Sequence, residues 1–156
     1  MSYAEDLKII PLIASEDSGA GVSMDSINMK NFHKATIAIT FATVVGNAVL
    51  TVNSGATDGA LTSALTFDHA VGGAAIGSAL ADVLADWTSA ATLTIAAATY
   101  STKMLVINID SKAMDIANGE EWLTVAISAA GTSAFVHAVA ILQPRYSGNM
   151  SLTGLA

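Results

Sequence analysis

Residues 35–53 read ATIAITFATVVGNAVLTVN, and the predicted fold is built outward from this stretch. Two runs rich in Val, Ile and Thr flank Gly46-Asn47, a dipeptide typical of the two-residue turn between antiparallel strands. The pattern predicts a β-hairpin in which Val45 pairs with Ala48. Because side chains alternate between the two faces of a strand, one face of this hairpin is strongly apolar. Its members are Ile37, Ile39, Phe41, Leu50 and Val52.

The opposite face of the predicted hairpin carries small, uncharged side chains. No Asp, Glu, Lys or Arg occurs from residue 35 through residue 57. A solvated sheet face usually carries charge, whereas the cores of protein interfaces are depleted in charged residues. Two readings stay open: a mildly polar face in solvent, or a face covered by another chain. The candidate self-association face consists of Thr36, Ala38, Thr40, Ala42 and Thr51.

Composition excludes several classes of function. Charged residues make up 12% of the 156 residues, and the net charge is −7. The acidic balance argues against a nucleic-acid partner, which requires a basic surface. The chain has no cysteine, so it has neither disulfides nor thiolate metal ligands.

Two segments, residues 35–57 and 122–144, carry no charged residue over a length that could span a bilayer. A turn interrupts each segment, and in both of them apolar and polar residues alternate with period two. We therefore expect no membrane-spanning segment, and the N-terminus lacks the pattern of a secretory signal.

The remaining chain is dominated by strand patterns. About eight short strands follow one another without alternating helices, which predicts one all-β domain, an antiparallel β-sandwich of jelly-roll-like type. Pro11 places the first strand at a sheet edge, and residues 121–128 and 133–142 are expected to form a second hairpin. Ile76, Leu80, Val83, Leu84 and Trp87 recur at helical spacing after Ser78, which predicts one short helix near residues 78–86. Residues 1–6 are expected to form an N-terminal arm and residues 147–156 a tail.

The sequence offers little catalytic chemistry. His33, His69 and His137 have no metal-ligand spacing, and Asp68-His69 reads as a solvated loop rather than half of a metal site. Glu120 and Glu121 are adjacent and read as a solvated turn; adjacent side chains point to opposite faces of a strand, so the two do not share a substrate. Trp87 and Trp122 read as core or interface anchors. We assign no catalytic, cofactor-binding or metal-binding residue and expect no enzyme activity and no cofactor.

The order of three motifs adds a resemblance to a known family. Residues 24–32 read MDSINMKNF and lead into the Thr/Ile-rich strand; Ala98-Thr99-Tyr100 precedes MLVINID at residues 104–110; the last strand ends in Pro144-Arg145-Tyr146. Over most of residues 24–146 this order resembles small structural proteins that tailed bacteriophages encode beside the major capsid protein. They include the capsid decoration proteins, also called cement or head-stabilising proteins.

The resemblance implies a function that depends on surfaces. It implies a jelly-roll sandwich, commonly a homotrimer, made in the cytoplasm of a bacterial host and bound to the capsid exterior in the virion. Its partners would be the major capsid protein and its own copies. The candidate capsid contacts near the chain ends are Met1, Ser2, Tyr3, Arg145, Tyr146 and Leu152. The alternatives are a head–tail connector or tail structural protein and, from another class, a carbohydrate-binding β-sandwich module.

Overall fold

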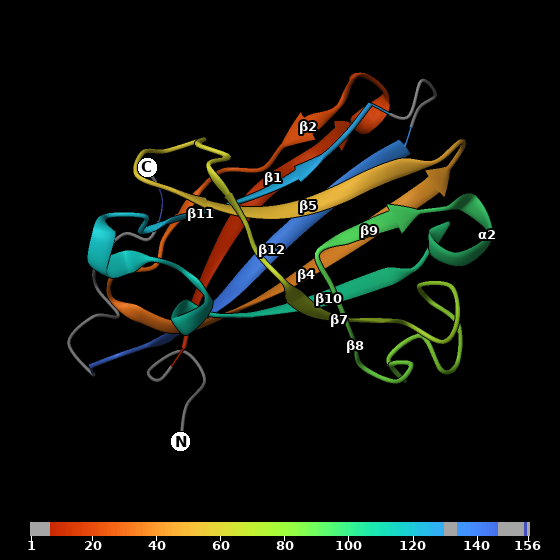
Figure 1. The fold of residues 1–156 in the computed structure, drawn as a ribbon. Coiled ribbons are helices and arrows are strands. Elements are labelled where there is room, and N and C mark those ends of the chain that lie inside the picture. Colours follow the sequence, from red (N-terminus) through yellow and green to blue (C-terminus); the bar gives the residue numbers. More distant parts are fainter. Residues whose placement is uncertain (1–6, 130–133, 147–154, 156) are drawn as a thin grey trace.

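The computed structural model describes residues 7–129, 134–146 and 155, and this part of the chain forms two antiparallel sheets packed face to face (Figure 1). Sheet A contains, in spatial order, β1 (Lys8–Asp17), β12 (Ala134–Pro144), β4 (Phe32–Val44), β10 (Met104–Asp110), β7 (Phe67–Val71) and β8 (Thr88–Ala90). Sheet B contains β2 (Val22–Ser23), β11 (Trp122–Ile127), β5 (Ala48–Gly55) and β6 (Ser63–Ala64), with β3 (Ile27–Asn28) paired to β11 and β9 (Thr92–Ile95) paired to β5. The short helical elements are α2 (Ala97–Tyr100) and the 3₁₀ turns η1 (Ser18–Ala20), η2 (Ser111–Ala113) and η3 (Ile116–Asn118). The predicted all-β antiparallel sandwich is confirmed.

The strand pairing explains how this sandwich is wound. The first strand pairs with the last, and the pairing continues inward: β1 with β12, β2 with β11, β4 with β10, and β5 with β9. The two halves of the chain therefore form a long antiparallel ribbon. This ribbon rolls up so that successive strands of each half fall in alternate sheets, which is the jelly-roll arrangement. The strands β6, β7 and β8 belong to the segment that connects the two halves of the ribbon, between β5 and β9.

The predicted hairpin across Gly46-Asn47 is wrong. The strand β4 pairs with β12 and β10 in sheet A, whereas β5 lies in sheet B beside β11. Gly46 has a φ of 87°, but Asn47 does not have a positive φ, so the pair does not form a type I′ hairpin turn. The connection is instead an arch from one sheet to the other. The second predicted hairpin fails in the same way, because β11 lies in sheet B and β12 in sheet A.

The alternation of the two strands was nevertheless assigned correctly. All five residues of the predicted apolar face are buried: Ile37, Ile39, Phe41, Leu50 and Val52. A hairpin and an arch bury the same alternate side chains, since in either case one face of each strand turns to the core. In the arch these side chains meet across the space between the sheets rather than side by side in one sheet.

The helix predicted near residues 78–86 is also absent. Residues 76–82 form turns, and four side chains of the predicted apolar stripe are exposed, whereas Leu84 is half-buried. Backbone hydrogen bonds hold this segment instead. Gly73 N donates to Val83 O within the loop, Ala85 N donates to Val71 O of β7, and Ile76 N donates to Thr102 O, shortly before β10. Leu80 has a φ of 71°, a left-handed conformation that a right-handed helix does not contain. Within the described residues the one α-helix is α2, which lies close to this loop at one end of the molecule (Figure 1).

The two ends of the chain are described only in part. The edge position predicted for the strand with Pro11 is confirmed, because β1 is the first strand of sheet A and its register shifts between Pro11 and Ile13. The expected arm at residues 1–6 lies outside the described residues. Of the expected tail, Leu155 is described; it forms an antiparallel bridge with Ile27 and packs against the core.

Disulfide trapping tests the arch directly, because the natural chain has no cysteine. Thr40 and His137 are opposite each other in the β4–β12 register, so Thr40→Cys combined with His137→Cys should form a disulfide on mild oxidation. Ala42→Cys with Thr51→Cys, a pair that would be adjacent in the hairpin, should stay reduced. Efficient cross-linking of the second pair, measured by thiol titration and mass spectrometry, would restore the hairpin.

The core position of Phe41 gives a second test. Its side chain is 3% exposed, and its ring meets the ring of Tyr100 edge-on at a centroid distance of 6.1 Å. Phe41→Ala should lower the free energy of unfolding by about 3–5 kcal/mol, because it removes apolar contacts and leaves a cavity. Urea denaturation measures this loss. Thr43→Ala, at an exposed position of the same strand, is the control and should change stability by less than about 0.5 kcal/mol.

Candidate interaction surfaces

The outer face of sheet A carries a continuous band without Asp, Glu, Lys or Arg. The register connects outward-facing positions of four neighbouring strands into rows, such as Pro11 beside Val139, Val139 beside Ala38, and Ala38 beside Val106. We call this surface the uncharged band. Its members are Ile9 and Pro11 on β1; His137, Val139 and Ile141 on β12; Thr36, Ala38 and Thr40 on β4; and Met104 and Asn108 on β10, between which the outward-facing Val106 is only 9% exposed.

Charged residues border the uncharged band. At one end Lys34 lies opposite both Asp110 and Gln143, and at the other end Asp17 lies opposite Phe135. On the flank, Asp68 of β7 lies opposite Asn108. Within the band Ile9 is 63% exposed, and just beyond it Phe135 is 48% exposed. An uncharged surface with charged residues at its two ends and along one flank has the composition of a protein contact surface.

The structure divides the candidate self-association face between the two layers. Thr36, Ala38, Thr40 and Ala42 lie along the outer side of β4, and the first three belong to the uncharged band. Thr51 lies on β5 opposite Ala126, so it faces outward from sheet B on the other side of the sandwich. Grouping the five residues on one face was therefore wrong, because that grouping depended on the hairpin pairing.

The outer side of sheet B has a shallow groove of about 410 Å³. The described residues that line it are small or apolar, among them Val49, Thr51, Leu61 and Ala126, and none of them is charged. These residues therefore offer no acid, no base and no metal ligand.

Two of the candidate capsid contacts fall within the described residues. The side chain of Arg145 is already engaged: Nε donates to Phe32 O at 3.2 Å, and a terminal guanidinium nitrogen donates to Ser111 Oγ at 2.9 Å. Arg145 therefore fastens the end of β12 to the start of β4 and to η2. Tyr146 is 73% exposed and remains a candidate contact. Met1, Ser2, Tyr3 and Leu152 lie outside the described residues.

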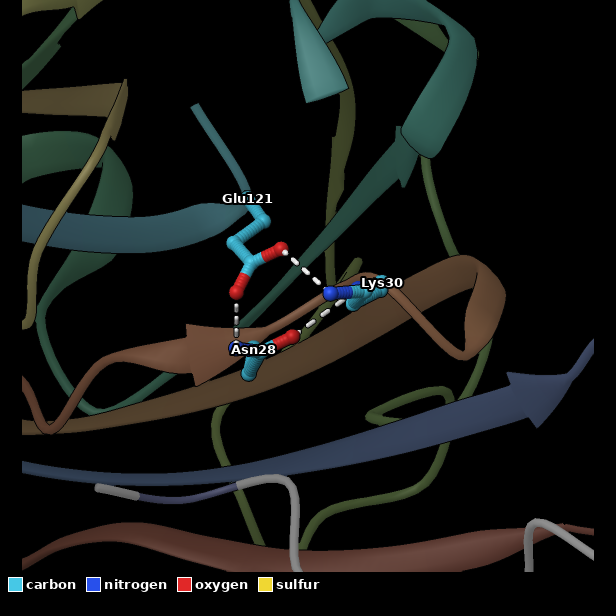
Figure 2. Close-up of polar contacts among 3 residues, drawn as sticks. All are labelled: Asn28, Lys30 and Glu121. Atoms are coloured by element: carbon cyan, nitrogen blue, oxygen red, sulfur yellow. Dashed lines mark hydrogen bonds and ion pairs between the residues drawn. The ribbon is translucent and has the colours of Figure 1, made fainter. Parts of the chain in front are cut away.

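The adjacent carboxylates Glu120 and Glu121 point in different directions, as the sequence predicted, but each is bound by other segments. Glu121 accepts a hydrogen bond from Asn28 Nδ2 at 3.0 Å and lies 3.6 Å from Lys30 Nζ (Figure 2). Glu120 accepts hydrogen bonds from the hydroxyls of Ser54 and Ser63. The expectation of a solvated turn was wrong, since this pair anchors the chain before β11 on two sides.

The pair Asp68-His69 lies on β7, inside the sheet rather than in a loop. Burial lowers the pKa of His69, although the backbone of Thr88 and the charge of Asp68 act in the opposite direction. His69 Nε2 lies 3.2 Å from Thr88 Oγ1, and the carboxylate of Asp68 accepts a hydrogen bond from Ser89.

Within the described residues, no three His, Cys, Asp or Glu side chains gather where they could hold a metal ion. The same part of the chain has no helix with the length and apolar character needed to cross a membrane.

Comparison with known proteins gives a likeness of fold. No protein-family model matches the chain, and no curated protein sequence matches it. The crystal structure of the SPBc2 prophage-derived protein YomS is similar, with a TM-score of 0.50 and 8% sequence identity over 87% of this chain and 93% of YomS. At this identity the likeness shows a shared fold alone. A structure of infectious bursal disease virus, Gt strain, gives a TM-score of 0.17 at 10% identity over 94% of this chain and 43% of that chain, a value too low to indicate a common fold.

A charge placed in the uncharged band tests whether the band is covered. Thr40 is half-buried at an outward position of β4, so Thr40→Lys should leave the fold intact, as checked by circular dichroism. If another copy covers the band, the lysine must lose water on association, and the variant should elute as a smaller species in size-exclusion chromatography. Thr92→Lys, at an exposed position of sheet B, is the matched control. An unchanged elution volume for Thr40→Lys would show that the band faces solvent.

Proposed function

We propose that this protein is a structural protein of a tailed-bacteriophage particle that binds the outside of the capsid and stabilises the shell. The observation that carries the proposal is the fold that this chain shares with YomS over most of both chains, because YomS is a prophage-derived protein. The resemblance of residues 24–146 to phage decoration proteins supports the same class. The partners are then the major capsid protein and further copies of this chain, in a homotrimer.

The described surfaces suit such a role. A decoration protein requires one surface for its own copies and one for the shell, and the uncharged band is a candidate for the first. Tyr146, exposed next to the well-anchored Arg145, is a candidate for the second. When several subunits hold several capsid subunits at once, weak individual contacts combine into a high effective affinity.

The rival from another class is a carbohydrate-binding module. Such a module stacks sugar rings on exposed aromatic side chains. The large exposed aromatic residues within the described chain are Trp87, Phe135 and Tyr146, and they belong to three separate segments rather than to one platform. This scatter favours the structural role.

The copy number of the protein in purified particles tests the proposal. Quantitative mass spectrometry of particles from the phage that encodes this chain should find it in numbers comparable to the major capsid protein. Particles assembled without it should release their DNA at a lower temperature, and adding the purified protein back should reverse this loss. Recovery in far fewer copies than the capsid protein would favour the connector or tail role, and absence from particles would contradict both.

A further inference from the structure

The loop between β7 and β8 presents large apolar side chains to solvent. Four of them, Ile76, Leu80, Val83 and Trp87, are between 46% and 65% exposed. We call residues 72–87 the apolar loop. Its backbone is fixed by hydrogen bonds to Val71, Thr102 and Met104, so the conformation is formed in the single chain while the side chains have no core to enter. An ordered loop with this composition is typical of a contact surface.

Leu80 is the most unusual residue of the apolar loop. It has a φ of 71°, in the left-handed region that residues other than glycine rarely adopt, and its side chain is 65% exposed. Strained backbone of this kind is concentrated at functional sites. Because the side chain is largely exposed within the described part of its own chain, little apolar burial offsets the cost of this backbone conformation. A role in contact with another molecule accounts for a leucine at this position.

The uncharged band alone is small for a stable interface. Four strands about 4.8 Å apart, with outward positions over about 20 Å of strand, give a surface of about 400 Å². A standard interface buries about 800 Å² on each partner. A copy that buries the band against one neighbour and a second, different surface against another neighbour loses about twice this area in all, although each single contact stays at about 400 Å² on each partner.

The positions and charges of the two surfaces are complementary. The apolar loop joins β7 to β8 at one edge of sheet A, whereas the band extends to β1 at the opposite edge. The loop carries Asp82 and Asp86, both exposed. Beside the band lie the exposed lysines Lys34 and Lys112, at the same end as Asp110 and close to Asp68 on the flank. Within the described part of the chain, neither of these aspartates and neither of these lysines forms an ion pair.

We propose that the apolar loop of one copy packs on the uncharged band of a second copy, with Asp82 and Asp86 directed toward Lys34 and Lys112. This inference rests on the self-association in the proposed function and names the two surfaces that meet. Since the surfaces differ, the contact is heterologous, and repeating it generates a closed ring or an open filament rather than a two-fold dimer.

Leu80→Gly tests the contact while sparing the fold. Glycine adopts a positive φ without strain, which offsets its greater freedom in the unfolded chain, so the unfolding midpoint should change little. Loss of the side chain should raise the dissociation constant, measured by sedimentation equilibrium, about tenfold or more. Leu61→Gly, at an exposed leucine beside sheet B, is the control. It should change the dissociation constant by less than about twofold.

A charge exchange identifies the partner surface. Lys34→Glu and Asp82→Lys should each weaken association several-fold, because each places like charges together across the contact. The double variant should recover most of the lost affinity. A double variant no better than the weaker single variant, or a Leu80→Gly protein that associates like the natural one, would overturn the proposal.

The failure of this contact and the failure of the proposed function are distinguishable. A protein that is monomeric at every concentration and on the particle, yet present in numbers comparable to the capsid protein, would overturn the contact and leave the capsid role standing. A protein that associates through the loop and the band but is absent from particles would support the contact and contradict the capsid role.

Discussion

The structure depends on the position of β4, whose two hydrogen-bonding edges are both occupied within sheet A. The strand β12 pairs along one edge and β10 along the other, while the inward side chains of β4 are buried against sheet B. The next strand in the chain therefore has no free edge of β4 to join and crosses to the other sheet. Pairing of early strands with late ones follows, and with it the jelly roll. The outer face of β4 becomes the centre of the uncharged band.

Local sequence patterns predicted which side chains are buried but not which strands pair. The alternation around Phe41 and Leu50 identified the inward residues correctly, because alternation depends only on the strand itself. The choice between hairpin and arch depends on β10 and β12, which are far away in the sequence. The helix prediction failed for a related reason. A helix with the apolar spacing from Ile76 to Trp87 requires a surface to pack on, and hydrogen bonds to Val71, Thr102 and Met104 hold the loop in another conformation.

The interaction surfaces could be predicted only in part. Thr36, Ala38 and Thr40 were recognised from the lack of charge along one strand, but the band also includes Ile9, Pro11, Val139 and Ile141 from the two ends of the chain. In the sequence these apolar residues alternate with residues that are buried, and this alternation is the pattern that could have identified them as outward-facing. Joining them into one surface required the register. Arg145 was proposed as a capsid contact because it lies near the chain end, whereas its hydrogen bonds to Phe32 and Ser111 show a role in holding the fold.

The molar mass of the unmodified protein in solution tests the central claim, that one copy covers the uncharged band of another. Light scattering across a dilution series measures this mass without any substitution. We expect a molar mass well above the 15.8 kDa of one chain at high concentration, falling toward that value on dilution. A mass of 15.8 kDa at every concentration would contradict it, because the band would then face solvent in the free protein.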